Sequence, residues 1–512
     1  MAGGAIDGTY SKKTAFVYIF NLVVGVGAIA MPIGFAKAGL VFGLLMLMFV
    51  GFLAFITSTF IIEASAAANY ILKHSESAFK PLIKDEDFNS EEDEEKNYRQ
   101  RHQQEYDDDI VGLVGGINRD DHDDLIEDGL PMKERGQDLT QESDFEIEMK
   151  TEVGEMAKMF LGDIGYKLFY VVLIFYLFGD LSIYSVTVPQ SLASVTGGFM
   201  GISDHNIYYL YLSFFGVFVA IMCQFNFQKT KYLQIFTLIT RNSAFFIMII
   251  LCLIFIAQGK GASISEIKIF DITEFGATWS VLIYAFMMHH SIPSIVTPIE
   301  KKSKLNLLLG MDLIMVFLAY SLLCVSSLFA FGAIKNPTCT PNNLHTFIPC
   351  AIQPLLIFNF SSYNVKIIAV FLNLFPVFTL STNYILICIT LRNNVMKIIT
   401  WKSKTANPAV RTGVFSLIIS VLPIGIGFIT RDIDFLVSIT GSYCGLGIML
   451  IMPVLISYFS NKVLKAQYGV KNKRKSPFAH PAVYIIIIMI SFGALIIATY
   501  KNITTYFIKP SH

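Results

Sequence analysis

Apolar runs of about twenty residues recur along most of the chain, and each run is long enough to cross a bilayer as a helix. Helices 1 and 2 fall within 14–70, and helices 3 to 11 fall within 161–500. We therefore expect an all-α, multi-pass membrane protein whose surroundings are the lipid bilayer. The eleven predicted spans are 14–36, 40–63, 165–189, 207–223, 232–256, 277–298, 307–331, 366–391, 412–429, 433–457 and 481–499.

A long polar segment, 71–160, separates helices 2 and 3. It holds about 27 acidic and 11 basic residues, so its net charge is near −16 although the whole chain is neutral. Such a segment buries too little apolar surface to fold alone, and we expect a mostly disordered cytosolic insert. The rest of the chain is basic and strongly apolar, which is typical of a membrane body and excludes nucleic acid as the expected partner.

The distribution of Lys and Arg predicts the orientation, with the N-terminus in the cytosol and the C-terminus in the lumen or outside the cell. Cys339 and Cys350 then lie in the outer loop between helices 7 and 8, where a disulfide bond between them would persist. The sequons at Asn359 and Asn502 also fall on that side and predict glycosylation, although each lies close to a membrane boundary.

The insert contains an acidic dileucine pattern, formed by Asp121, Leu125 and Ile126. Patterns of this kind are read by adaptor proteins that deliver membrane proteins to endosomes or lysosomes. The alternative is a chance match, because an acidic stretch easily supplies the acidic position.

Two spans contain residues that interrupt a helix. The first holds Gly25, Gly27 and Pro32, and the second, at 289–298, holds two prolines, three hydroxyls and two imidazoles. For the first span alone, a glycine-rich helix contact with a proline kink explains the residues equally well. However, the interrupted spans are the first and the sixth, and interrupted helices in corresponding halves of an inverted repeat mark the binding site of many secondary transporters.

The motif Asn21-x-x-x-Gly25-x-Gly27-Ala28-x-x-x-Pro32 resembles helix 1 of the amino acid/auxin permease branch of the amino acid–polyamine–organocation (APC) superfamily. Over nearly its full length the chain is similar to the transmembrane protein 104 family. This resemblance implies discontinuous helices 1 and 6 in a LeuT-like fold of five plus five inverted-repeat helices and one more, and a secondary active amino acid transporter. The stretches that carry it are 20–32, 62–69, 179–184, 228–235, 290–298, 374–383 and 390–394.

In that fold, free backbone groups at the breaks hold the amino and carboxylate ends of the substrate. Only one of the two adjacent imidazoles, His289 and His290, is expected to face the cavity, and Tyr284 could instead be a packed aromatic. The candidate substrate-binding residues are Asn21, Gly25, Val26, Gly27, Ala28, Tyr284, His289, Ser291 and Ser294.

No cofactor is expected apart from a coupling ion, Na⁺ or H⁺. Hydroxyls of helix 8 form a sodium site in related transporters, which makes Thr379, Ser381 and Thr382 candidates, although hydroxyls also bond to their own helix. Asp180 and Arg241 lie inside spans, where charge is costly and commonly functional, so both are candidates for ion coupling, and any proton would need Asp180 or a histidine as its carrier. Arg241 resembles a basic residue that replaces sodium in some proton-coupled relatives, and its alternative role is a cytosolic-side anchor.

Two other functions remain open at this point. A non-transporting amino acid sensor would signal through the acidic insert, and an ion channel is disfavoured because no ring of selectivity residues is apparent. No Walker loop, metal cluster or nucleophile elbow occurs in the sequence, so we expect no enzyme.

Overall fold

The computed structural model describes residues 9–79, 142–196, 204–224, 231–335, 350–398 and 408–508. These residues form helices and connecting segments, with a single isolated β-bridge between Tyr10 and Ile299. The first half contains α1 (Lys12–Val23), α2 (Val26–Ala38), α3 (Leu40–Phe79), η2 (Glu142–Phe145), α5 (Val153–Thr196), α6 (Asp204–Met222), α7 (Lys231–Ala257), η4 (Ile272–Glu274), α8 (Phe275–Ala285), η5 (His289–Ser291) and α9 (Ile292–Val296). The second half contains α10 (Leu305–Phe331), η6 (Leu356–Phe360), α11 (Lys366–Ile398), α12 (Pro408–Ile429), α13 (Ile433–Ile439), η7 (Thr440–Gly445), η8 (Gly447–Ile451), α14 (Met452–Val463), η9 (Leu464–Tyr468), α15 (Pro481–Asn502) and η10 (Ile503–Ile508).

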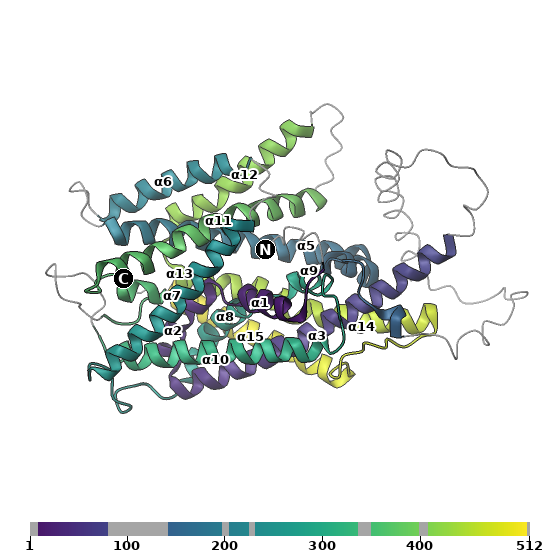
Figure 1. The fold of residues 1–512 in the computed structure, drawn as a ribbon, viewed down its shortest axis with the longest axis horizontal. Helices are drawn as coiled ribbons and strands as arrows, with labels where there is room; N and C mark the ends of the chain where they lie inside the picture. The colour runs from purple at the N-terminus through teal and green to yellow at the C-terminus, as the bar shows by residue number, and fades with distance from the viewer. Residues whose placement is uncertain are drawn as a thin grey trace, which may run out of the picture.

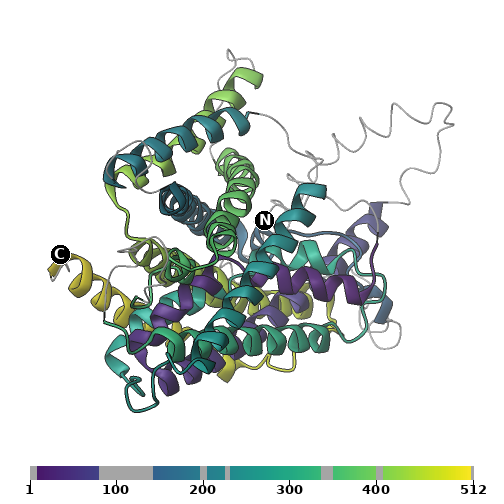
Figure 2. The same ribbon diagram turned by 60° about the vertical axis from the view of Figure 1, so that its left-hand side comes forward.

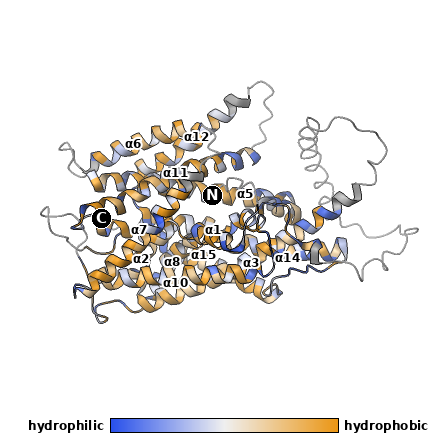
Figure 3. Ribbon diagram, in the orientation of Figure 1, coloured by the Kyte–Doolittle hydropathy of each residue, from blue (hydrophilic) through white to orange (hydrophobic). Residues whose placement is uncertain are grey.

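The described helices confirm an all-α, multi-pass membrane protein. Eight of them are long and apolar enough to span a bilayer, and the bent pair of α1 and α2 makes a ninth. The shorter apolar α6 and the interrupted segment from α8 to α9 match the two remaining predicted spans. Apolar residues predominate along the helices (Figure 3), and many large apolar side chains are exposed, as expected of helices that face lipid. Each predicted span therefore has a helical counterpart, while the number of actual crossings remains a prediction.

The helices pack in two groups. In one group α5, α6, α11 and α12 contact one another, and in the other α1 and α2 pack with α3, α8 and α10. Figures 1 and 2 show α6 and α12 side by side at the edge of the first group, away from α3 and α10. The groups combine helices that lie five spans apart in sequence, which is the grouping expected of a five-plus-five repeat.

Helix 1 is broken at its predicted position. α1 ends at Val23, α2 begins at Val26, and the two axes differ by 53°. Between them Gly25 is extended (φ −123°, ψ −152°) and so cannot continue the helix. α2 ends before Gly39, whose φ of +92° favours glycine and whose added Cβ would lie 2.6 Å from the backbone of Ile269.

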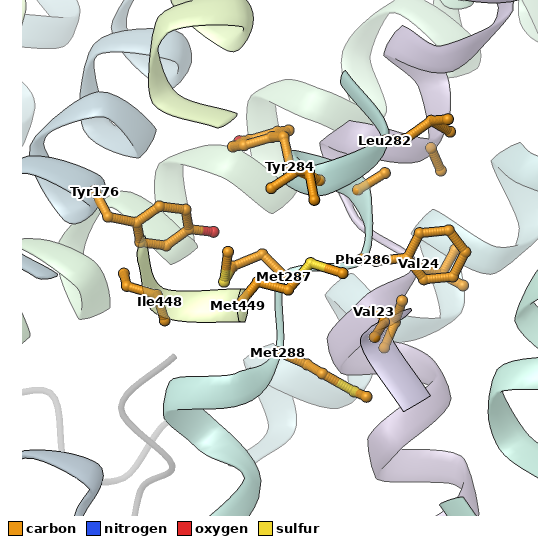
Figure 4. Packing of buried hydrophobic residues seen from close by; sticks show 14 of the residues in the cluster. Val23, Val24, Tyr176, Leu282, Tyr284, Phe286, Met287, Met288, Ile448 and Met449 are labelled. Carbon is orange, nitrogen blue, oxygen red and sulfur yellow. The ribbon is translucent and has the colours of Figure 1, made fainter. Parts of the chain in front are cut away.

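Helix 6 is broken as well. α8 ends at Ala285, and after three non-helical residues the chain forms η5 and then the short α9. Figure 4 shows this non-helical stretch, with Met287 and Met288, passing close to the end of α1 at Val23 and Val24. The two interruptions therefore meet in the interior of the protein.

The last part of the predicted insert is folded. Residues 142–152, which we call the insert anchor, lie against the end of α3, where the Asn69 side chain accepts from the amides of Glu148 (2.9 Å) and Met149 (2.7 Å) and donates to the Met149 carbonyl (3.0 Å). Phe145 is fully buried and stacks on Tyr70. Residues 80–141, including the sorting pattern of Asp121, Leu125 and Ile126, lie outside the described residues.

Candidate functional site

A cavity of about 90 Å³ lies where the broken helices meet. One water needs roughly 10–15 Å³ of such space, so the cavity has room for several waters or for one small solute. Helices α1, α2 and α8 of one group line it together with α5 and α11 of the other group and with α7. The lining residues are Leu22, Val23, Val24, Gly25, Val26, Gly27, Ile29, Tyr176, Asp180, Tyr184, Arg241, Phe245, Met248, Tyr284, Ala285, Met287, His290, Phe375, Pro376, Thr379, Leu380, Asn383 and Ile387.

One buried hydroxyl ties the two broken helices together. Tyr320 on α10 points its hydroxyl at the carbonyl of Val23 (2.8 Å), at the end of α1, and at the carbonyl of Ala285 (3.2 Å), at the end of α8. Helix ends leave such carbonyls without intrahelical partners, and each would be costly if left unpaired in the membrane interior. Tyr320 thereby fixes the relative positions of the two breaks.

The glycine at position 27 allows α2 to approach α8 closely. A Cβ added at Gly27 would lie 2.6 Å from Ala285 Cα and 2.9 Å from Ala285 Cβ. At Gly25, by contrast, the nearest atom to an added Cβ is the Val23 carbonyl oxygen at 3.9 Å. Gly27 is therefore required for helix packing, whereas a Cβ at Gly25 would be accommodated.

Asn21 forms hydrogen bonds with neighbouring polar groups and does not line the cavity. The Arg241 guanidinium on α7 donates to the Asn21 backbone carbonyl (2.6 Å), and the Asn21 side-chain oxygen accepts from Asn242 (2.8 Å). The prediction that Asn21 faces the cavity is therefore wrong, because its amide is used to position α7 against α1. Arg241 itself lines the cavity, so its role is not that of a surface anchor.

Asp180 is a buried carboxylate on the opposite wall. Tyr176 and Tyr284 line the cavity together with it, and one of its oxygens has no partner among the described residues. Asp180 and Arg241 both line the cavity, yet no ion pair joins them in the part of the chain that the structure describes. Two opposite charges thus face one small cavity from different helices.

In the second break, the imidazole that reaches the cavity is that of His290. His289 is turned toward α3, where its Nε2 lies 2.8 Å from the Thr57 hydroxyl and 3.1 Å from the Ser58 hydroxyl. Ser291 and Ser294 do not line the cavity either. The prediction of one packed and one facing imidazole agrees with this arrangement, but the choice of His289 as the cavity residue is wrong.

Of the three hydroxyls proposed for sodium on α11, only Thr379 lines the central cavity, and its oxygen has no partner among the described residues. Ser381 and Thr382 line a separate apolar cavity of about 490 Å³ against α5 and α6. Thr382 also donates to the carbonyl of Phe378 in its own helix (2.8 Å). The proposed set of three hydroxyls is therefore not assembled around one point.

Comparison with known proteins places this geometry in a family. A family model described as "Transmembrane amino acid transporter protein" matches residues 8–84, which include the first break. Over 99% of its length the chain is 55% identical to the transmembrane protein 104 homolog of Dictyostelium discoideum, and the match covers 100% of that relative. Transmembrane protein 104 of Gallus gallus is 35% identical (98% of each chain covered) and that of Homo sapiens 33% (96% of each). The chain belongs to the transmembrane protein 104 family.

Family membership confirms the resemblance drawn from the helix-1 motif, and the family model supports an amino acid transporter at the level of the family. In this member of the transmembrane protein 104 family, the cavity also uses residues that the sequence reasoning missed. The most informative are Tyr176 and Tyr184, which flank Asp180 at spacings of four residues. That spacing puts all three on one face of a helix, so it is a signal that could have identified them.

The outer-loop predictions have mixed outcomes. Cys350 is disulfide-bonded, but its predicted partner Cys339 lies outside the described residues, so the pairing remains a prediction. Asn359 is fully buried, with its amide bonded to the backbone of Cys350, Ala351 and Gln353. Asn502 is also buried and accepts from Ser438 (2.7 Å). Glycosylation of either asparagine would require this packing to open, and the structure argues against both sites.

Proposed function

We propose that this protein is a secondary active transporter of amino acids and that the substrate binds in the cavity between the broken helices. One observation carries the proposal: a single cavity is lined at once by the breaks in helices 1 and 6 and by the opposite charges of Asp180 and Arg241. The family model that covers the first break, whose description names amino acid transport, supports the same conclusion.

We propose coupling to protons rather than to sodium. The Arg241 guanidinium bonds to the Asn21 carbonyl near the end of α1, where a coupling cation would otherwise be coordinated. Arginine stays protonated in proteins, so Arg241 substitutes for the ion but cannot carry a proton. His290 lines the cavity with its Nδ1 unpartnered among the described residues, and imidazole ordinarily titrates near neutrality. His290 is therefore the proposed proton carrier.

The two helix groups supply a route for alternating access. Because α1, α2 and α8 line one side of the cavity and α5 and α11 the other, rocking of one group against the other would open the site to either face. We retain the predicted orientation, which places the insert anchor in the cytosol. We also retain endosomal or lysosomal delivery through the dileucine pattern as part of the proposal.

Uptake by purified protein in liposomes tests this function. An inward proton gradient should drive accumulation of at least one labelled amino acid from a full panel, and replacing sodium with choline should not alter it. The adjacent imidazoles provide a matched pair: His290→Gln should abolish the proton dependence, whereas His289→Gln should keep it.

Absence of uptake for the entire panel would overturn the transporter proposal. If an amino acid then stabilised the purified protein thermally, the sensor alternative would take its place. Sodium-dependent uptake that persists in His290→Gln would refute the proposed coupling while leaving transport itself intact.

A further inference from the structure

We infer that Asp180 binds the ammonium group of the substrate and that the substrate class is the small zwitterionic α-amino acids. This inference rests on the proposed function, since it assumes that the cavity holds an amino acid. It replaces the coupling role first considered for Asp180 with a recognition role, and it defines the size and charge of the ligand.

The carbonyl groups that could receive an ammonium at the helix breaks are largely occupied. At the end of α1, Asn21 O accepts from Arg241 and Val23 O from Tyr320. At the end of α8, the carbonyls of Leu282, Tyr284 and Ala285 accept from Phe286, Met287 and Tyr320 respectively. A charged acceptor would therefore bind a substrate ammonium more strongly than the remaining lone pairs of these carbonyls.

Asp180 provides that acceptor. The residue is 6% exposed and lines the cavity, and one of its carboxylate oxygens has no partner in the described structure. A buried carboxylate that lacks a cationic partner is costly in a membrane, and an ammonium bound there would supply both the charge and the missing hydrogen bond. The free oxygen of Asp180 thus has the chemistry of an ammonium site.

The carboxylate of the ligand is matched elsewhere in the same cavity. Val26 and Gly27 begin α2, their helix carries no side-chain cap, and both residues line the cavity. The start of a helix favours negative charge. Arg241 adds a full positive charge on a neighbouring wall. The ligand's two charges are therefore received by different helices, which explains why Asp180 and Arg241 do not pair with each other.

Size and charge both restrict the rest of the ligand. The volume of about 90 Å³ is bordered by bulky rings, among them Tyr176, Tyr184 and Phe375. The described lining contains one carboxylate, one guanidinium and one imidazole, so an additional charge on the substrate would lack a fixed counter-charge. The cavity fits glycine, alanine or serine.

Comparing a ligand that has an ammonium group with one that lacks it tests the assignment of Asp180 as the ammonium site. Binding of L-alanine and of propionate, which has no ammonium, is measured by thermal-shift titration of the purified full chain for wild type and for Asp180→Asn. Loss of a charge-assisted hydrogen bond should weaken alanine binding roughly 10- to 100-fold. Propionate binding should stay within about threefold of wild type, because propionate never used Asp180.

Asp312→Asn is the matched control. Asp312 is another fully buried carboxylate without partners among the described residues, but it lies on α10 and does not line the cavity. Alanine binding should be unchanged in this variant. If Asp180→Asn fails to fold, Asp180→Glu tests the same assignment, since the added methylene should shift preference from alanine toward glycine.

Equal weakening of alanine and propionate by Asp180→Asn would overturn the inference, as would unchanged alanine binding or an unchanged alanine-to-glycine ratio in Asp180→Glu. If wild type takes up larger or charged amino acids but binds none of the three small ones, the proposed function survives and the assigned substrate class is wrong.

Discussion

The close approach of α2 to α8 at Gly27 leaves no room for a single added methyl group. In Gly27→Ala the new Cβ would lie 2.6 Å from Ala285 Cα, 2.9 Å from its Cβ and 3.1 Å from its nitrogen. Carbon atoms pack at about 3.5–4.0 Å, so the helices would have to separate by about 1 Å. Two of these three neighbouring atoms are backbone, at the helix end whose carbonyl Tyr320 binds, and no side-chain rotation can relieve the contact.

Overpacking of this kind costs about 1–3 kcal/mol. Since 1 kcal/mol corresponds to about 2–4 °C in domains of 150–250 residues and to less in longer chains, Gly27→Ala should lower the apparent melting temperature by a few degrees. It should also abolish uptake, because separation of α2 from α8 displaces both halves of the cavity wall. The assay is thermal unfolding of the purified protein in detergent without substrate, followed by uptake in liposomes.

Gly25→Ala serves as the control two residues away. Its Cβ would meet nothing closer than 3.9 Å, and the extended backbone at Gly25 has a negative φ. Replacing glycine where the conformation is compatible can even stabilise a protein by about 0.4–1 kcal/mol through the unfolded state. Equal melting temperatures for the two variants would refute the described packing of α2 on α8, whatever happens to uptake.

Three further perturbations test other parts of the structure. Tyr320→Phe leaves two buried helix-end carbonyls without their partner and should cost about 1–3 kcal/mol, measured as a lower melting temperature; an unchanged value would mean that the hydroxyl does not join the breaks. Asn69→Ala removes three hydrogen bonds to the insert anchor and should accelerate tryptic cleavage after the exposed Lys150, whereas wild-type cleavage rates would show that the anchor is held in another way. Leu125→Ala combined with Ile126→Ala should move the protein to the plasma membrane, and microscopy that finds unaltered localisation would mark the dileucine pattern as a chance match.

The helix breaks were predictable from sequence because glycine and proline act on their own backbone. Glycine weakens a helix through its own backbone wherever the segment packs, so an interruption near Gly25 was recognisable without knowledge of its neighbours, although Gly27 and Pro32 lie inside α2. The spacing of two such interruptions five spans apart then indicated that they meet. Both inferences depend on local chemistry and on chain order alone.

The direction of individual side chains was not predictable in this way. His289 and His290 are adjacent in a short 3₁₀ turn, and only the position of α3 beside it decides which imidazole finds Thr57 and Ser58. The same applies to α11, where Thr379 faces the breaks and Ser381 faces α5 and α6. A sequence pattern shows that polar groups are available on a helix, whereas the neighbouring helices determine which of them reach the cavity.

The insert anchor crosses the boundary between the two helix groups. Glu148 pairs with Lys73 on α3 (3.0 Å), and Glu152 pairs with Lys397 on α11 (3.1 Å). These partly exposed ion pairs contribute little, about 0–1 kcal/mol each, so the anchor is held mainly by Phe145, whose burial contributes about 1.5–3 kcal/mol, and by the bonds to Asn69.

If one group rocks against the other as proposed, the distance that the insert anchor must bridge changes. Consider a partner protein that binds the acidic insert only when the insert anchor is released. Its binding would favour the conformations in which the two helix groups have moved. By linkage, a substrate that binds those conformations would in turn strengthen binding of the partner. Transport and sensing would in that case depend on the same conformational equilibrium. The reason is that the insert anchor, through which a sensor would signal, contacts both of the helix groups that a transporter must move relative to each other.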